Sequence, residues 1–181
     1  MFRRLPFLAL FVAASALAGG AVFAEKVKPA ADGKAKNAAF ERLKKLTGTW
    51  TGKADHGDFV ADVTFVYKVT AHGSTVVETL FAGTDHEMIT MYTMDGDKLM
   101  LTHYCAAGNQ PRMKAEKSDD PKKIAFKFVD GANLNPAEDM HMHEGTIEWV
   151  DDDHIKSEWV GYHKGKPVGT AKFDLRRQKA K

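Results

Sequence analysis

Apolar and polar residues alternate with a period of two over most of this chain, which is the pattern of β-strands that bury one face. The run Val63, Phe65, Tyr67 and Val69 illustrates it. Further strands are predicted at residues 75–81, 87–94, 98–105, 112–117, 123–129, 140–150, 154–163 and 168–176. Gly, Pro, Asn and Asp clusters separate these segments and predict tight turns. We therefore expect an all-β fold, an antiparallel up-and-down barrel of about eight to ten strands, with a sandwich as the alternative.

One short helix is predicted before the strands. Asn37 is a suitable N-cap, and Phe40, Leu43 and Leu46 follow at helical spacing. Gly48 is able to end this helix. The barrel is thus expected to begin directly after a single helix.

The first 24 residues have the pattern of a secretory signal peptide. Arg3 and Arg4 give a positive start, residues 5–17 are apolar, and residues 22–24 form a cleavage site. An uncleaved membrane anchor is the alternative, because residues 5–23 carry no charge. We expect cleavage, no stable membrane span afterwards, and an exported protein that is periplasmic or secreted.

The remaining chain divides into three parts. Residues 25–36 are rich in Lys, Ala and Pro and are expected to form a disordered linker. Residues 37–177 are enough for one barrel domain with its own core. Residues 178–181 form a short basic tail. Because the formal net charge is only +2, we expect no nucleic-acid partner.

Five side chains able to bind a metal or do chemistry share the strand parity of the apolar residues. They are His103, Cys105, His141, His143 and His163. Strand parity predicts that they face the barrel interior, although one β-bulge between His143 and Trp149 would turn two of them outward. In an oxidising compartment the single cysteine has no internal disulfide partner, so Cys105 is either a buried apolar residue or a functional thiol.

The segment Leu46-Thr47-Gly48-Thr49-Trp50-Thr51-Gly52, placed between a helix and a series of hairpins, resembles the start of lipocalin-like (calycin) barrels. Together with residues 95–99 and 102–105, it is similar to an uncharacterised group of exported bacterial barrels of that superfamily. In lipocalins a late Arg stacks on the Gly-x-Trp tryptophan, which implies a structural contact between Arg177 and Trp50. Nitrobindin-type haem barrels have a similar Gly-x-Trp and a ligating His near the C-terminus. Here the last predicted strand has no His, and His163 is the nearest substitute.

These observations favour a non-catalytic barrel that binds a small, largely apolar molecule in its interior. The ligand-binding candidates are His103, Tyr104, Cys105, His141, His143, Trp159 and His163. Tyr67 and Tyr92 are further candidates for pocket hydroxyls, and Glu78 is expected at a strand edge or loop in water. The eight methionines would suit an adaptable apolar pocket or irregular core filling.

Two other functions remain open from the sequence. His103, His141 and His143 could ligate zinc or copper, or the barrel could hold haem, although no cofactor is required by the leading hypothesis. Alternatively, the barrel could be an envelope scaffold or interaction module. A catalytic site is not expected, because no residue that would orient a Cys105–His pair is evident.

Overall fold

A computed structural model of the protein describes residues 37–57 and 59–179. The predicted signal peptide and linker lie outside the described residues, as do the last two residues of the tail. The described chain contains one α-helix, a single turn of 3-10 helix and ten β-strands. These are α1 (Ala38–Lys44), β1 (Gly48–Asp55), β2 (Val60–Thr70), η1 (Ala71–Gly73), β3 (Thr75–Leu80), β4 (Met88–Asp95), β5 (Lys98–Tyr104), β6 (Gln110–Ala115), β7 (Lys123–Ala132), β8 (His141–Asp151), β9 (His154–His163) and β10 (Lys166–Arg177). In this part of the chain, no helix is both long and apolar enough to cross a bilayer.

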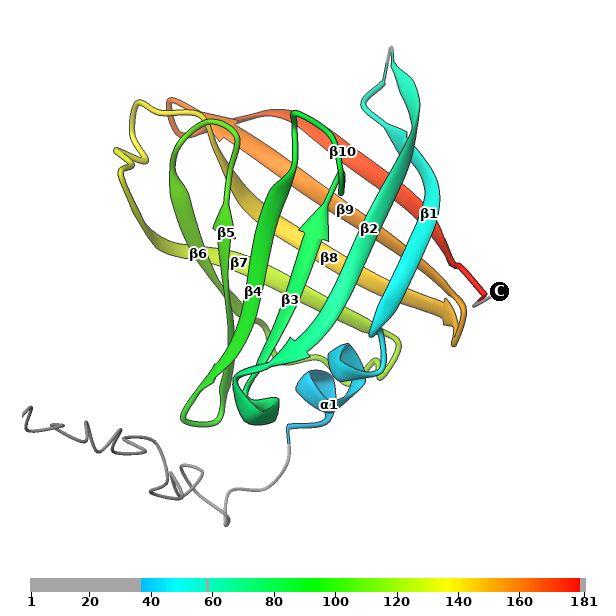
Figure 1. Cartoon of the computed structure of the whole chain (residues 1–181). Helices are drawn as coiled ribbons and strands as arrows, with labels where there is room; N and C mark the ends of the chain where they lie inside the picture. The colour runs from blue at the N-terminus through cyan, green and yellow to red at the C-terminus, as the bar shows by residue number, and fades with distance from the viewer. Residues whose placement is uncertain (1–36, 58, 180–181) are drawn as a thin grey trace, which may run out of the picture. The chain divides into compact units, whose positions relative to one another are not determined.

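The strands form one closed antiparallel barrel (Figure 1). Each strand pairs with the strand before and after it in sequence, and β1 pairs with β10 to close the sheet. The predicted up-and-down barrel is confirmed, with a strand number at the upper end of the expected range. Closure leaves no free sheet edge. Each strand of the barrel has one face toward the interior and one toward solvent, which explains why the alternating pattern runs through the strands.

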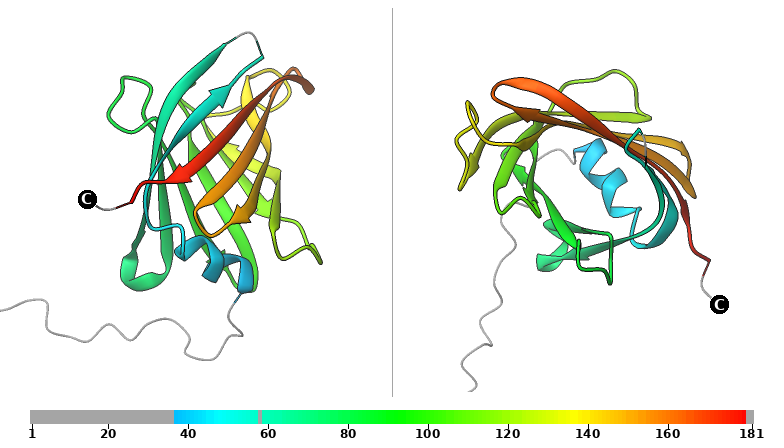
Figure 2. Two further views of the ribbon diagram at one scale, coloured as in Figure 1. Left: turned by 90° about the vertical axis from the view of Figure 1, so that its right-hand side faces the viewer. Right: turned by 90° about the horizontal axis from the view of Figure 1, so that it is seen from above.

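The helix α1 fills one end of the barrel. Asn37 caps it as predicted, because its side chain accepts a hydrogen bond from the Phe40 backbone N–H at 3.0 Å. Phe40, Leu43 and Leu46 are buried, and a view along the barrel shows α1 within the ring of strands (Figure 2). The helix ends at Lys44, whereas Gly48 opens β1 with a φ of +128°.

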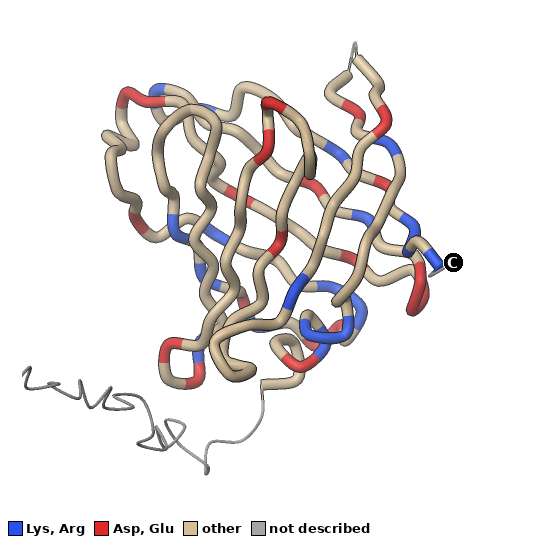
Figure 3. The backbone as a smooth tube through the Cα atoms, in the orientation of Figure 1, with Lys and Arg blue, Asp and Glu red and all other residues tan. Residues whose placement is uncertain are grey.

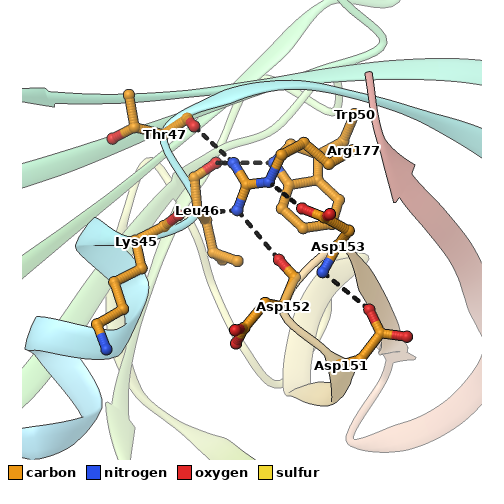
Figure 4. A network of polar contacts seen from close by, with 8 residues as sticks. All are labelled: Lys45, Leu46, Thr47, Trp50, Asp151, Asp152, Asp153 and Arg177. Atoms are coloured by element: carbon orange, nitrogen blue, oxygen red, sulfur yellow. Dashed lines mark hydrogen bonds and ion pairs between the residues drawn. The ribbon is translucent and has the colours of Figure 1, made fainter. Parts of the chain in front are cut away.

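The α1 end is held together by Trp50 and Arg177 (Figure 4). The Arg177 guanidinium lies over the Trp50 ring, 4.4 Å from its centroid, which is the contact implied by the lipocalin resemblance. The same guanidinium donates to the Thr47 carbonyl at 2.7 Å and the Lys45 carbonyl at 2.9 Å. Its Nε donates to the Asp153 carboxylate at 2.8 Å. One side chain therefore ties the last strand to the C-terminal side of the helix and to the β8–β9 turn.

Replacing Arg177 by Ala is expected to lower the free energy of unfolding by about 2 kcal/mol, through loss of charge-assisted hydrogen bonds and the cation–π contact. Urea denaturation measures this value. Arg176→Ala is the matched control, since Arg176 is the preceding residue of β10 and is exposed. Equal stability of the two variants would contradict this account of the barrel end.

Charged residues of both signs are interspersed along the strands and turns (Figure 3). Among the described Asp, Glu, Lys and Arg residues, Glu78 alone is buried, with 1% of its surface exposed. Most of the other buried residues are apolar, and Phe65, Phe126 and Ile147 among them are fully buried. A buried carboxyl group in such surroundings requires hydrogen-bond partners, and these define the site described next.

Candidate functional site

Four polar residues form a row across the inner wall of the barrel, one on each of four adjacent strands. In the strand register Tyr67 of β2 lies opposite Glu78 of β3, Glu78 opposite Thr90 of β4, and Thr90 opposite His103 of β5. All four are buried. Antiparallel pairing alone therefore brings together side chains that are up to 36 positions apart in sequence. We call these four residues the polar row.

Glu78 is the centre of the polar row. The Tyr67 hydroxyl donates to one of its carboxyl oxygens at 2.6 Å, and the Tyr92 hydroxyl donates to the other at 2.6 Å. Thr90 Oγ1 and His103 Nδ1 are hydrogen-bonded at 2.9 Å. The carboxyl and the two tyrosine hydroxyls are thus hydrogen-bonded to one another. His103 is the last residue of the polar row.

Burial governs how these groups titrate. It raises the pKa of Glu78, although the hydroxyls of Tyr67, Tyr92 and Thr90 oppose this by stabilising the carboxylate. Burial, followed by the adjacent Glu78 charge, raises the pKa of both tyrosines well above 10.0. Burial lowers the pKa of His103 from 6.5 to about 4, so the imidazole is neutral at pH 7.

His103 meets Trp159 of β9 across the barrel. Their rings stack with centroids 6.0 Å apart and planes inclined by 27°. The Trp159 ring lies against Gly145 of β8, where an added Cβ would come within 2.7 Å of it. Three buried polar atoms in this region have no hydrogen-bond partner within the described protein: His103 Nε2, Trp159 Nε1 and Ser157 Oγ. Unpaired buried polar atoms are costly, so these three distinguish this part of the inner wall from the fully paired groups around Glu78.

His141 and His143 belong to a separate cluster near the end of the barrel opposite α1. The register of β8 against β9 shifts between Met142 and Glu144, so that Met142 lies opposite Gly161 and His141 opposite Tyr162. This β-bulge removes the pair from the parity of Trp159. His141 is buried as expected, whereas His143 is only partly buried, and neither lies beside His103.

The two histidines contact each other and aromatic neighbours. His141 is buried, and its Nε2 is hydrogen-bonded to His143 Nδ1 at 3.0 Å. The His143 ring stacks on Tyr162, with centroids 4.0 Å apart, and on Phe128, at 4.9 Å. Burial and the neighbouring His141 lower the pKa of His143. The pair is thus held by ring packing together with the hydrogen bond between the two imidazoles.

Three other candidates lie away from the polar row. His163 is exposed at the end of β9, so its expected inward orientation is wrong. Tyr104 has 45% of its surface exposed. Cys105 follows the end of β5 and is partly exposed, which excludes the fully buried alternative. Parity ends with the strand, so it carries no information about residues in the turn beyond β5.

The proposed metal ligands are not brought together. In residues 37–57 and 59–179, no three His, Cys, Asp or Glu side chains are grouped closely enough to hold a metal ion. His103 lies in the polar row, whereas His141 and His143 lie in the aromatic cluster with Phe128. The donor set expected for zinc or copper is therefore divided between two places.

Glu78 was missed by the sequence analysis, which placed it in water. The structure corrects this, because Glu78 shares a face of β3 with Val76 and Leu80, which are both buried. That parity was available in the sequence. Because β3 also carries apolar Val77 on its other face, the alternation does not by itself indicate which face of this strand is buried.

Two clefts in the described part of the chain are lined by none of the four residues of the polar row. The larger, of about 1610 Å³, lies between α1 and the β6–β7 connection and reaches Leu46, Leu99 and Trp149. The smaller, of about 360 Å³, lies along β1, β9 and β10 and includes Lys53 and Ser157. The larger cleft is lined by both acidic and basic residues, so its charge favours neither an anionic nor a cationic ligand.

No protein-family model matches this chain, and no curated protein matches it either. Solved structures do resemble it. A protein of unknown function from the DUF3598 family of Nostoc punctiforme has a TM-score of 0.52 and 12% identity, over 75% of this chain and 49% of that one. The chain thus corresponds to about half the length of that protein. Rv2717c from M. tuberculosis has a TM-score of 0.53 and 17% identity, over 81% of this chain and 100% of that one. At these identities the similarity shows a shared β-barrel fold.

Proposed function

We propose that this protein is an exported β-barrel that binds a small, largely apolar molecule inside the barrel, at the end of the polar row. The observation that carries the proposal is the set of buried, unpartnered atoms His103 Nε2, Trp159 Nε1 and Ser157 Oγ. Leaving a buried polar group unpaired costs about 1–3 kcal/mol. A ligand that pairs these atoms recovers that free energy on binding.

The surroundings of these atoms favour an apolar body for the ligand. Aliphatic and aromatic side chains together make up the buried core, and Met113 is fully buried among them. Four apolar residues at the strand ends opposite α1 have exposed surface, namely Phe59, Val60, Met140 and Val168. Apolar side chains exposed at one end of a barrel are a suitable surface on which an apolar molecule can first bind.

The remaining parts of the proposal rest on the sequence. Residues 1–24 have the features of a signal peptide, which supports export to the periplasm or beyond. The Gly-x-Trp segment and the Arg177 contact on Trp50 support a relationship to lipocalin-like barrels. In that case the protein is a carrier or a binding protein and not a catalyst.

Native mass spectrometry of the full-length chain, isolated from the producing cells, tests this proposal. We expect the wild-type protein to retain a small molecule, and the variant His103→Gln to retain less than half as much. His163→Gln is the matched control, because His163 is an exposed histidine away from the polar row. Wild-type protein that carries only water, together with an organic extract that contains no stoichiometric compound, would overturn the proposal.

A further inference from the structure

The direction of each hydrogen bond in the polar row follows from Glu78, whose carboxylate can only accept. Both tyrosine contacts to this carboxyl are 2.6 Å long, which is the range of hydroxyl donors to an ionised carboxylate. Thr90 lies opposite Glu78 in the strand register, and its hydroxyl also stabilises the carboxylate. A carboxylate is the strongest acceptor near Thr90, so the single hydroxyl proton of Thr90 points to Glu78.

This direction determines the tautomer of His103. Once the Thr90 proton is directed to Glu78, Thr90 Oγ1 has only lone pairs to offer His103 Nδ1, 2.9 Å away. The bond then requires the imidazole proton on Nδ1. A neutral imidazole carries one proton, so His103 Nε2 is left as a bare acceptor facing the unpaired region.

The unpartnered atom of Trp159 has the opposite role. An indole Nε1 is a donor only, and here it is buried without an acceptor. The acceptor and the donor belong to two rings that stack on each other. A group that serves both must donate one hydrogen bond and accept one, which a hydroxyl does through a single oxygen atom.

We propose that the interior ligand is an uncharged molecule with an alcohol hydroxyl, whose oxygen donates to His103 Nε2 and accepts from Trp159 Nε1. This inference rests on the proposed function and specifies the chemical class of its ligand. Ser157, two residues before Trp159 on the same buried face of β9, carries a further unpartnered hydroxyl.

Charged ligands fit this place poorly. A carboxylate has no proton for His103 Nε2, and it would approach the Glu78 carboxylate in a region of low dielectric constant. An ammonium group donates to His103 Nε2 but offers nothing to Trp159 Nε1, because it has no acceptor. An ether accepts from Trp159 yet leaves His103 unpaired.

Isothermal titration of the full-length protein at pH 7 with four matched octyl compounds tests the inference. The probes are 1-octanol, 1-methoxyoctane, octanoate and octylammonium. We expect 1-octanol to bind tightest, and the ether, which loses one hydrogen bond to a buried acceptor, to bind about tenfold more weakly.

In Trp159→Phe, which removes the N–H and keeps an aromatic ring, the affinity for 1-octanol should fall by about tenfold as well. Trp149→Phe is the matched control, because Trp149 is also buried but lies at the α1 end under Arg42.

The outcomes separate the two proposals. Equal binding of 1-octanol and the ether, or tighter binding of either charged probe, would overturn the hydroxyl assignment and leave interior binding intact. Equal losses in Trp159→Phe and Trp149→Phe would also overturn it. If no probe binds and the isolated protein carries only water, the proposed function itself fails.

Discussion

Replacing Glu78 by Ala is expected to lower the free energy of unfolding by about 3–5 kcal/mol, one of the largest effects of any single substitution in this barrel. The carboxyl accepts from two fully buried tyrosine hydroxyls, each at 2.6 Å. Its loss leaves both hydroxyls without an acceptor and opens a cavity where the side chain stood. Urea denaturation followed by tryptophan fluorescence measures the change.

A double-mutant cycle identifies the cause of this loss. Glu78→Gln keeps the shape and one carbonyl oxygen, so we expect a smaller loss than in Glu78→Ala. Tyr67→Phe should destabilise the wild-type protein but cost little in the Glu78→Ala background, because the hydroxyl it removes is already unpaired there. Additive effects of Glu78→Ala and Tyr67→Phe would contradict the direct hydrogen bond as the source of stability.

Most of the fold could be predicted from the sequence, because the period-two pattern records burial directly. The predicted segment 154–163 coincides with β9, 98–105 extends one residue beyond β5, and 140–150 is shifted by one residue relative to β8. The start of the barrel was marked by the N-cap at Asn37 and by Trp50. Regular antiparallel hairpins with short turns left few alternatives for the order of the strands.

The site was harder to predict, for two physical reasons. Parity is a local property, and the bulge at His143 reverses it without any glycine or proline there to mark the position. The polar row, in contrast, is created by register between strands, so the contact of Glu78 with Tyr67 and Tyr92 depends on how hairpins align. The sequence predicted His103 and Trp159 as site residues. It could not show that Glu78, through Thr90, determines which nitrogen of His103 carries the proton.

Lowering the pH is expected to destabilise the folded protein, because the His103 imidazole is buried. Burial lowers the pKa of His103 to about 4, against 6.5 for an exposed histidine. Below pH 6.5 His103 therefore binds a proton in the unfolded chain but stays neutral in the folded protein. The free energy of unfolding consequently falls with decreasing pH down to about pH 4. At about 1.4 kcal/mol per pKa unit, this histidine costs the wild-type protein about 3 kcal/mol between pH 7 and pH 4.

His103→Gln isolates this contribution, because glutamine does not titrate and all other groups remain. The wild-type advantage in unfolding free energy over His103→Gln should shrink by about 3 kcal/mol from pH 7 to pH 4. Long-range ¹H–¹⁵N spectra of the wild-type protein provide an independent measurement, and should show His103 protonated on Nδ1 and neutral at pH 6. A difference between the two proteins that stays constant over this pH range would contradict the lowered pKa of His103. A proton found on Nε2 would contradict the arrangement in which Thr90 directs its hydrogen to Glu78 and leaves an acceptor facing the barrel interior.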